Sequence, residues 1–104
     1  MRIIRATSDH VGDLLLLRTQ LWPDCPEEKH RKEITEELAD EESLPVFLAV
    51  DTDGTVIGFL EASVHPDLHG APGGPVGYVE GLFVLAPHRR CGVGRALIQA
   101  AWLL

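Results

Sequence analysis

A short run of glycine and arginine constrains this chain more than any other feature of its sequence. The run spans Arg89 to Gly94 (RRCGVG), follows an apolar segment that ends near Val84, and leads into helical spacing. Glycines let a backbone approach a ligand, and the N–H groups at a helix N-terminus carry partial positive charge. The run therefore predicts a turn between a strand and a helix that binds an anion such as pyrophosphate.

Basic side chains gather at this turn, although the chain as a whole is acidic. The formal net charge is −7, yet three of the nine Lys and Arg residues, Arg89, Arg90 and Arg95, fall within seven positions. Guanidinium groups bind phosphate oxygens bidentately. Local anion binding is therefore favoured, whereas the overall charge argues against nucleic acid and is compatible with a cationic substrate. Acidity that serves only solubility is the alternative.

Two other phosphate-binding loops do not fit this run. A P-loop needs Gly-Lys followed by Ser or Thr, where the chain has Gly94-Arg95-Ala96. A dinucleotide-binding fingerprint needs a small residue at position 97, which is Leu97. The remaining alternative is a glycine-rich turn whose arginines are merely solvated.

Length and composition predict one soluble globular domain covering residues 1–104. The chain is 45% apolar and 24% charged, and no stretch approaches the roughly 20 apolar residues of a membrane helix. The apolar stretch after Met1 is too short for a signal peptide, so we expect a cytoplasmic protein. Cys25 and Cys91 lack the spacing of a disulfide framework or zinc site and are expected to be free thiols.

The first half of the chain predicts a strand followed by two helices. Arg2 to Arg5 is a short apolar-centred strand, and Thr7-Ser8-Asp9 are capping residues for a helix that runs to about Leu21 and is stopped by Pro23. A second helix starts at Pro26 and continues through Ala39, with Ile34 and Leu38 as its apolar contacts. We expect this helix to be well exposed.

The second half predicts three strands and a last helix. They are placed at Val46–Val50, at Val56–Val64, at Val76–Val84, and from about Gly92 to the end of the chain. A turn at 51–54 makes the first two strands a hairpin, and His65–Pro75 is expected to be a loop. Gly81 indicates a bulge or a close approach by a ligand. The predicted fold class is α+β, a mostly antiparallel sheet with flanking helices.

Arg-x-x-Gly-x-Gly after an apolar strand resembles the coenzyme A signature of the GNAT superfamily of N-acetyltransferases. The order of elements matches the first half of that fold. The resemblance extends to aminoglycoside 6'-N-acetyltransferases and covers nearly all 104 residues. The segments that carry it are Leu17-Arg18, Gln20–Pro23, Phe47–Ala49, Ile57–Phe59, Ala62-Ser63 and Glu80–Val84.

This resemblance implies a site for acetyl-coenzyme A (acetyl-CoA) and a site for an amine. It implies that the backbone of Leu82, Phe83 and Val84 pairs with the pantetheine arm. The residues expected to hold the pyrophosphate are Arg89, Arg90, Cys91, Gly92, Val93, Gly94 and Arg95. It further implies that Glu80 is a general base or substrate anchor and that Trp22 lines the aminoglycoside pocket, while Leu68 stands where some relatives carry an aromatic.

Acetylation of an amine needs a base, because an amine with a pKa of about 9 to 10 is mostly protonated at pH 7. Glu80 lies among apolar residues, so we expect a partly dry carboxylate for which a bound ammonium is a partner. The alternative is a glutamate at a strand edge that faces solvent or pairs with an arginine. Open N–H groups of a bulged strand could stabilise the oxyanion. Trp22 has its own alternative, a plug at a helix end.

The sequence assigns no catalytic or metal-binding role to the remaining histidines of the loop or to the tyrosine. His65 and His69 are four apart, but Pro66 and Gly70 disfavour a helix there, so they are expected to be loop histidines and no metal is expected. Relatives offer a tyrosine from a later helix as general acid. The only tyrosine here, Tyr78, is not in that position, so the acid is unassigned.

The resemblance also predicts an incomplete domain, because a GNAT fold continues beyond the coenzyme A motif. We therefore expect the strand at Val76–Val84 and the apolar face of the last helix to be covered by a second copy or by another polypeptide. A truncated gene is the alternative. For function, the alternatives are a non-catalytic coenzyme-A-binding or assembly module, and an acetyltransferase that acts on a polyamine or peptide amine.

Overall fold

A four-stranded antiparallel sheet forms the centre of the computed structural model, which describes residues 1–65 and 76–103. The elements, in chain order, are β1 (Arg2–Arg5), the short 3-10 helix η1 (Ser8–His10), α1 (Val11–Leu21), α2 (Glu27–Ala39), β2 (Val46–Val50), β3 (Val56–His65), β4 (Val76–Val84), the short 3-10 helix η3 (Ala86–His88) and α3 (Val93–Trp102). The strand order is β1-β2-β3-β4, so the chain order is also the spatial order. The α+β prediction is confirmed.

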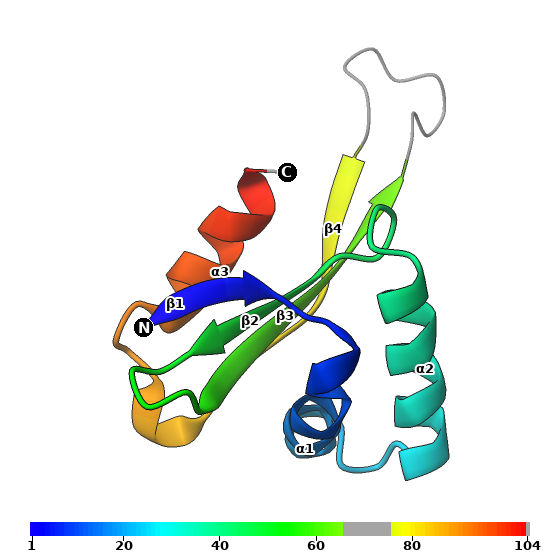
Figure 1. Cartoon of the computed structure of the whole chain (residues 1–104), viewed down its shortest axis with the longest axis horizontal. Helices are drawn as coiled ribbons and strands as arrows, with labels where there is room; N and C mark the ends of the chain where they lie inside the picture. The colour runs from blue at the N-terminus through cyan, green and yellow to red at the C-terminus, as the bar shows by residue number, and fades with distance from the viewer. Residues whose placement is uncertain (66–75, 104) are drawn as a thin grey trace.

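The helices lie on two faces of the sheet (Figure 1), with α1 and α2 on one face and α3 on the other. Because side chains alternate along a strand, β2 serves both faces. Leu48 packs against Leu14 and Ile34 of α1 and α2, whereas Phe47 and Ala49 pack with Leu97 of α3. The result is one apolar core cluster on each face.

The helix boundaries follow from local signals read in the sequence. Thr7 caps η1: its hydroxyl accepts from the Asp9 N–H at 3.3 Å, and its own N–H donates to His10 Nδ1 at 2.9 Å. Helix α1 ends at Leu21, before Pro23, and Pro26 is the residue preceding α2. The predicted span of the second helix holds to within a residue, whereas the first predicted helix is divided into η1 and α1. The last predicted helix ends at Trp102, before the end of the chain, and the turn η3, after β4, was not predicted.

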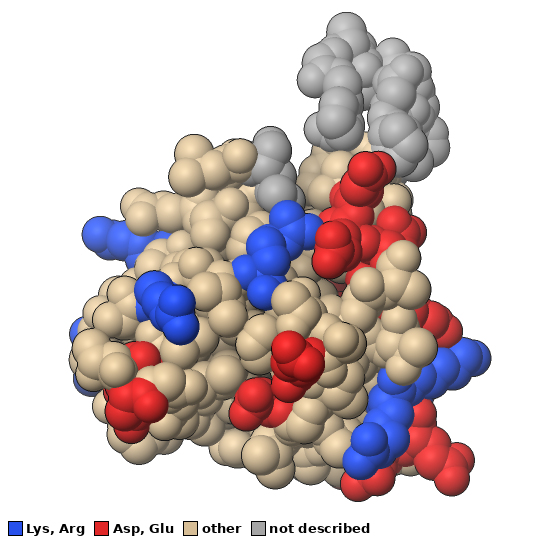
Figure 2. Space-filling model, in the orientation of Figure 1, with Lys and Arg blue, Asp and Glu red and all other residues tan. Residues whose placement is uncertain are grey.

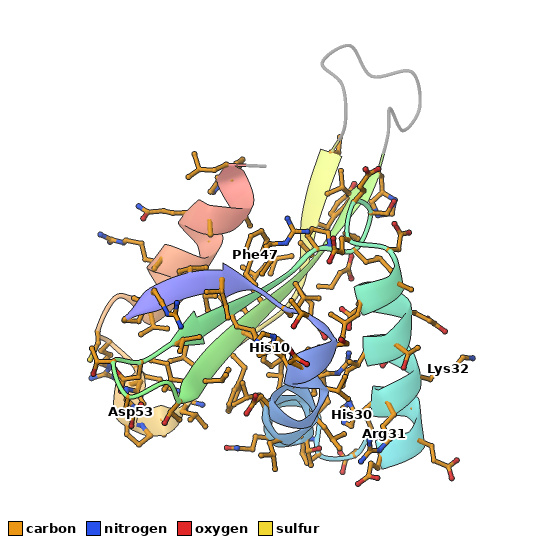
Figure 3. The ribbon with its side chains drawn as sticks, in the orientation of Figure 1. His10, His30, Arg31, Lys32, Phe47 and Asp53 are labelled. Carbon is orange, nitrogen blue, oxygen red and sulfur yellow. The ribbon has the colours of Figure 1, made fainter. Side chains whose placement is uncertain are left out.

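Most residues of the second helix are exposed, as the sequence predicts, and its inner face packs on the core. Ile34 and His30 are fully buried, and Leu38 packs against the core on the α1 side of the sheet. Figure 3 labels His30 between α1 and α2, while Lys32 projects from the outer side of α2. Helix α2 is thus one wall of a buried polar cluster.

Strand β4 carries the irregularity that the sequence indicated at Gly81. Glu61 of β3 pairs with Gly81, and the next residue, Ala62, pairs with Val79, so Glu80 is the extra residue of a β-bulge. The close approach at Gly81 is made by Trp22: a Cβ on Gly81 would lie 2.6 Å from Trp22 Cη2. A side chain of the chain itself, and not a ligand, accounts for that glycine.

Strand β4 is also the last strand of the sheet. Its inner edge pairs with β3 from His65↔Val76 to Gly58↔Val84, and its outer edge has no strand partner among residues 1–65 and 76–103. Over the same residues, no helix is long and apolar enough to cross a membrane. The predicted loop at 66–75, with Leu68 and His69, lies outside the described residues; His65 is the last residue of β3.

Candidate functional site

A hollow of about 770 Å³ lies between the sheet and the α1–α2 pair. Its lining residues are Arg18, Leu21, Trp22, Pro23, Asp24, Cys25, Lys29, Glu33, Glu36, Glu37, Leu44, Glu61, Ser63, His65 and Glu80. Six of them are carboxylic acids and two are basic. Binding pockets for small molecules have volumes of roughly 300–1,000 Å³, so the hollow is of suitable size and its chemistry suits a cation.

The floor of this hollow is organised by one buried arginine. Arg18 is 3% exposed and donates from Nη1 to Glu61 Oε2 at 2.7 Å and to Glu37 Oε1 at 3.0 Å, and from Nη2 to Glu33 Oε1 at 2.7 Å. Its Nε donates to His30 Nδ1 at 3.2 Å. No buried side-chain polar atom among the described residues lacks a hydrogen-bond partner. A buried charge is tolerated only in such a satisfied network.

The arginine also determines the tautomer of His30, and it lies beside two carboxyl groups with raised pKa values. Because Nδ1 of His30 accepts from Arg18, the ring proton is on Nε2, which donates to the carbonyl oxygen of Trp22 at 3.2 Å. His30 is therefore a neutral structural residue. Burial, followed by its hydrogen bond to Glu61, raises the pKa of Glu37 to about 9. Burial also raises the pKa of Glu61, so at neutral pH this carboxyl pair retains a proton on Glu37.

Trp22 forms one wall of the hollow and is held from several sides. The Arg18 guanidinium lies 5.0 Å from its ring centroid, and the Phe59 ring meets it edge-on at 6.4 Å. Its far edge packs on the backbone at Gly81. Trp22 is thus both a plug at the end of α1 and part of the pocket lining, so the two sequence interpretations are compatible.

Glu80 reaches the rim of the same hollow from the bulge of β4. It is exposed, which differs from the partly dry carboxylate expected from its apolar neighbours. The bulge and the edge position of β4 account for the difference, because they turn Glu80 out of the paired ladder. Its Oε1 accepts a hydrogen bond of 2.6 Å from the Ser63 hydroxyl, and His65 Nε2 lies 3.1 Å from the same hydroxyl oxygen.

The glycine- and arginine-rich turn lies at the other end of β4 and forms the start of α3. Arg90 and Gly92 have positive φ angles of 65° and 82°, and Gly92 is the residue that precedes α3. In the described residues, the N–H groups of Arg90, Cys91 and Gly92 donate no backbone hydrogen bond. A Cβ placed on Gly92 or Gly94 would meet nothing within 4 Å. The turn therefore offers free amides and open space at a helix N-terminus, as an anion site requires.

All three arginines of this turn are exposed, but one of them is also bound to the main chain. Arg89 Nε donates to the carbonyl oxygen of Val84 at 2.7 Å, and its guanidinium lies 5.2 Å from the centroid of the Phe83 ring. Arg89 is therefore held against the end of the strand, whereas no such side-chain contact is seen for Arg90 or Arg95 among the described residues. Val93 is buried against the sheet, and the Cys91 thiol is exposed. Of the expected anion contacts, those from the main chain and from Arg90 and Arg95 fit the geometry best.

One further group of side chains resembles a metal site. Ligand atoms of Cys25, His30 and Glu33 lie within 4.8 Å of one another. However, both ring nitrogens of His30 are already hydrogen-bonded, and Glu33 is paired with Arg18. A metal would have to break these contacts, so we assign this group to the buried polar cluster.

Sequence reasoning missed most of the floor of the hollow. The signals were present: Arg18 falls on the apolar face of α1, in register with Leu14 and Leu21, and Glu61 alternates with Phe59 on the core face of β3. Charged residues at core positions indicate paired burial. Figure 2 shows acidic (red) and basic (blue) side chains interleaved over α2. The surface of this helix therefore gives no sign of the buried cluster beneath it.

Comparison with known proteins finds relatives over almost the whole chain. Residues 14–102 match the acetyltransferase (GNAT) family. The aminoglycoside N(6')-acetyltransferase type 1 of Klebsiella aerogenes is 40% identical over 84% of this chain and 59% of its own length. The enzyme of the same name from Stenotrophomonas maltophilia is 43% identical over 96% of this chain and 65% of its own. The chain thus spans somewhat under two thirds of these relatives.

Solved structures give the same result. The aminoglycoside antibiotic 6'-N-acetyltransferase of Acinetobacter haemolyticus superposes with a TM-score of 0.85 at 38% identity, covering 99% of this chain and 70% of that one. AAC(6')-Iy, in complex with the bisubstrate analogue CoA-S-monomethyl-acetylneamine, superposes with a TM-score of 0.87 at 36% identity, covering 98% of this chain and 69% of that one.

Proposed function

Because this chain belongs to the acetyltransferase (GNAT) family, we propose that it transfers an acetyl group from acetyl-CoA to a primary amine, the 6'-amine of an aminoglycoside. One observation carries the proposal: Glu80 stands at the rim of an acidic hollow, on the strand that leads into the glycine- and arginine-rich turn. An acceptor site and a donor site are thus joined by one strand, which extends about 13 Å over the four residues from Glu80 to Val84.

The donor side fits acetyl-CoA in its charge and its open space. The free amides of residues 90–92, the start of α3, and the exposed Arg90 and Arg95 would hold the pyrophosphate. The open outer edge of β4 at Leu82, Phe83 and Val84 offers amide and carbonyl groups to the pantetheine arm. Bound there, acetyl-CoA supplies an acetyl thioester that reacts with a neutral amine.

The acceptor side fits a molecule with several positive charges. Exposed carboxylates at the rim attract ammonium groups, and the Trp22 ring supplies an apolar and cation-binding wall. A polyamine or a peptide amine would satisfy the same charges. The aminoglycoside is favoured because the relatives at 40% and 43% identity carry that name.

Glu80 is assigned the proton chemistry of the reaction. A substrate ammonium attacks only after it loses a proton, and the Glu80 carboxylate is within the hollow that would hold it. The Ser63 hydroxyl that donates to Glu80 holds the carboxylate in one orientation. The bulge at Glu80 also interrupts the regular β3–β4 ladder, next to where the acetyl carbonyl would lie.

Calorimetry with coenzyme A and a free-thiol assay with a kanamycin-like acceptor test the two halves of this proposal. Arg90→Ala should weaken coenzyme A binding about 10-fold or more, since a contact to a charged phosphate is worth about 1.5–3 kcal/mol. Gly92→Asp should weaken it further, because it adds a negative charge and strains a backbone with φ of 82°. Arg31→Ala, an exposed arginine of α2, is the matched control and should bind normally.

In the thiol assay, Glu80→Gln should lower kcat by about 10²-fold or more while coenzyme A binding is unchanged. Coenzyme A binding without turnover in the native chain would instead support the non-catalytic binding module. A folded chain whose calorimetric titration with coenzyme A shows no heat would overturn both functions.

We also propose that another polypeptide, or a second copy, covers the open side of β4 and α3. An apolar groove of about 330 Å³ lies there between β3, β4 and α3, and Trp102 and Leu103 beside it are 81% and 87% exposed. Sedimentation at low micromolar concentration should show a species larger than the monomer. A well-folded, strictly monomeric chain would refute this.

A further inference from the structure

A line of three hydrogen-bonding side chains leads from Glu80 back along β3. Ser63 Oγ lies 2.6 Å from Glu80 Oε1, and His65 Nε2 lies 3.1 Å from the same Oγ. Ser63 is 5% exposed, so its hydroxyl is largely shielded from water. All three residues line the acidic hollow. Neither Ser63 nor His65 was among the expected site residues.

The chemistry of the groups gives this line a direction. A hydroxyl has one proton, and the Ser63 hydroxyl donates it to the Glu80 carboxylate, which can only accept a hydrogen bond. The contact with His65 therefore requires a proton on His65 Nε2, donated to Ser63 Oγ. When Glu80 has taken a proton, the direction can reverse: Glu80 then donates to Ser63 Oγ, and the Ser63 hydroxyl donates to Nε2 of a His65 whose proton is on Nδ1.

His65 is held in place for such a role but retains access to water. It is the last residue of β3, where it pairs with Val76, and it is half-buried. The edge of the Tyr78 ring meets its imidazole, with ring centroids 5.3 Å apart. The imidazole is thus fixed against β4 and can still exchange a proton with solvent.

We propose that His65, acting through Ser63, forms a proton relay that removes from Glu80 the proton taken from the substrate ammonium. The inference rests on the proposed function, because it assigns the fate of the proton that Glu80 accepts. His65 is a relay residue here, since it acts through Ser63 and Glu80 and not by contact with the reacting atoms.

The steps conserve every proton. The ammonium N–H bond breaks as an O–H bond forms on Glu80, which becomes neutral. His65 exchanges protons with solvent: it releases its Nε2 proton to water and takes one from water at Nδ1, so that Nε2 becomes an acceptor. The Glu80 proton then passes to Ser63 Oγ while the hydroxyl proton passes to His65 Nε2, so the net change is a neutral amine, a regenerated carboxylate and an imidazolium. The imidazolium releases its Nδ1 proton to water. Imidazole is a stronger base than a carboxylate in water, so the relay returns Glu80 to its basic form.

Other ionisable groups face the same hollow and must be separated from His65 in any pH measurement. They come from every element around it: Arg18 of α1, Asp24 and Cys25 of the α1–α2 connection, Lys29, Glu33, Glu36 and Glu37 of α2, Glu61 of β3, and Glu80 of β4. Tyr78 of β4 does not line the hollow, but its ring contacts the His65 imidazole. None of the others is an imidazole. A change in rate that disappears with His65 alone therefore identifies the relay.

The test compares His65→Gln and Ser63→Ala in the thiol assay between about pH 5 and 9, the range in which imidazoles titrate. Glutamine at 65 can still donate to Ser63 but cannot accept and pass on a proton. We expect kcat to fall about 10-fold in each variant, less than for loss of the base itself, with KM for the amine nearly unchanged. The acid-side inflection of the rate profile should disappear in His65→Gln.

Three controls make the result specific. Ser63→Thr retains a hydroxyl and should restore most of the rate, and the Ser63→Ala/His65→Gln double variant should be no slower than Ser63→Ala alone. His88→Gln, a histidine near the opposite end of β4, should leave the profile unchanged. Native turnover with a His65→Gln profile identical to the native one would overturn the relay alone. A native chain without turnover would sink the proposed function and the relay with it.

Ring nitrogen spectra of His65 check the geometry without activity. In the resting chain, the proton should be on Nε2, and Ser63→Ala should change the His65 ring signals. Ring signals that are identical in Ser63→Ala would refute the hydrogen-bonded line.

Discussion

The two faces of the sheet are packed with opposite kinds of side chain. Under α3, the buried residues of the described chain are all apolar, from Phe47 and Leu60 to Leu97. Under α1 and α2, the apolar cluster shares its space with Arg18, His30 and Glu61. The apolar face stabilises the fold by an amount that does not depend on pH. The polar face stabilises it less, because it buries charged groups, but it forms the acidic hollow. A sheet with only the first kind of packing would have no place for a cation.

Arg18→Met should break this contrast most strongly. It removes the cation that pairs with Glu33, Glu37 and Glu61 and leaves the buried Glu61 carboxylate without a positive partner, which costs about 3–5 kcal/mol. Urea denaturation should show a larger loss at pH 8 than at pH 5, because carboxyl groups can be protonated in acid. Leu97→Ala, on the apolar face, should cost about 2–5 kcal/mol, equally at both pH values. Equal pH dependence in the two variants would contradict the contrast.

Gly81→Ala should have an intermediate effect, because it separates Trp22 from the sheet. The new Cβ would lie 2.6 Å from Trp22 Cη2, so the indole must move, at a cost of about 1–3 kcal/mol. Thermal unfolding and the KM for the amine should both report the displacement. Gly77→Ala, on the same strand, is the matched control: its Cβ would have no neighbour closer than 3.9 Å, so it should be nearly neutral. An equal response of the two variants would refute the role given to Trp22.

Glu37→Gln should give the smallest change, visible mainly as a function of pH. Folding raises the pKa of this carboxyl from 4.5 to about 9, so the folded state binds its proton more tightly. The resulting stabilisation is complete below pH 4.5 and is lost as pH rises toward 9. The melting temperature of the native chain should therefore fall over this range, and more gradually in Glu37→Gln. Glu28→Gln, exposed on the same helix, should keep the native slope; a Glu37→Gln slope as steep as the native one would refute the assignment.

The sequence predicted the elements well because their boundaries depend on local chemistry. Thr7, Pro23 and Pro26 limit helices through their own caps and rings, and the turn at Gly92 needs only the freedom of that residue. The turn expected to hold the acetyl donor was located between a strand and a helix for the same reason. Its residues are contiguous in the sequence, so one motif contains them.

The acceptor side was harder to predict because its residues meet only after folding. Arg18 and Glu61 are 43 positions apart, and nothing near either one specifies the other. The relay from Glu80 to His65 depends on the register of β3 against β4, which the bulge shifts by one residue. Glu80 was expected to be partly dry from its neighbours in sequence; the edge position that exposes it is a property of the sheet.

The amides of residues 90–92 belong to the main chain, so their capacity to donate does not depend on which side chains surround them. The acidic hollow, by contrast, is built from side chains that single substitutions can alter. Substitutions at α2 and β4 can therefore change what the hollow accepts while the main-chain donors of the turn stay intact.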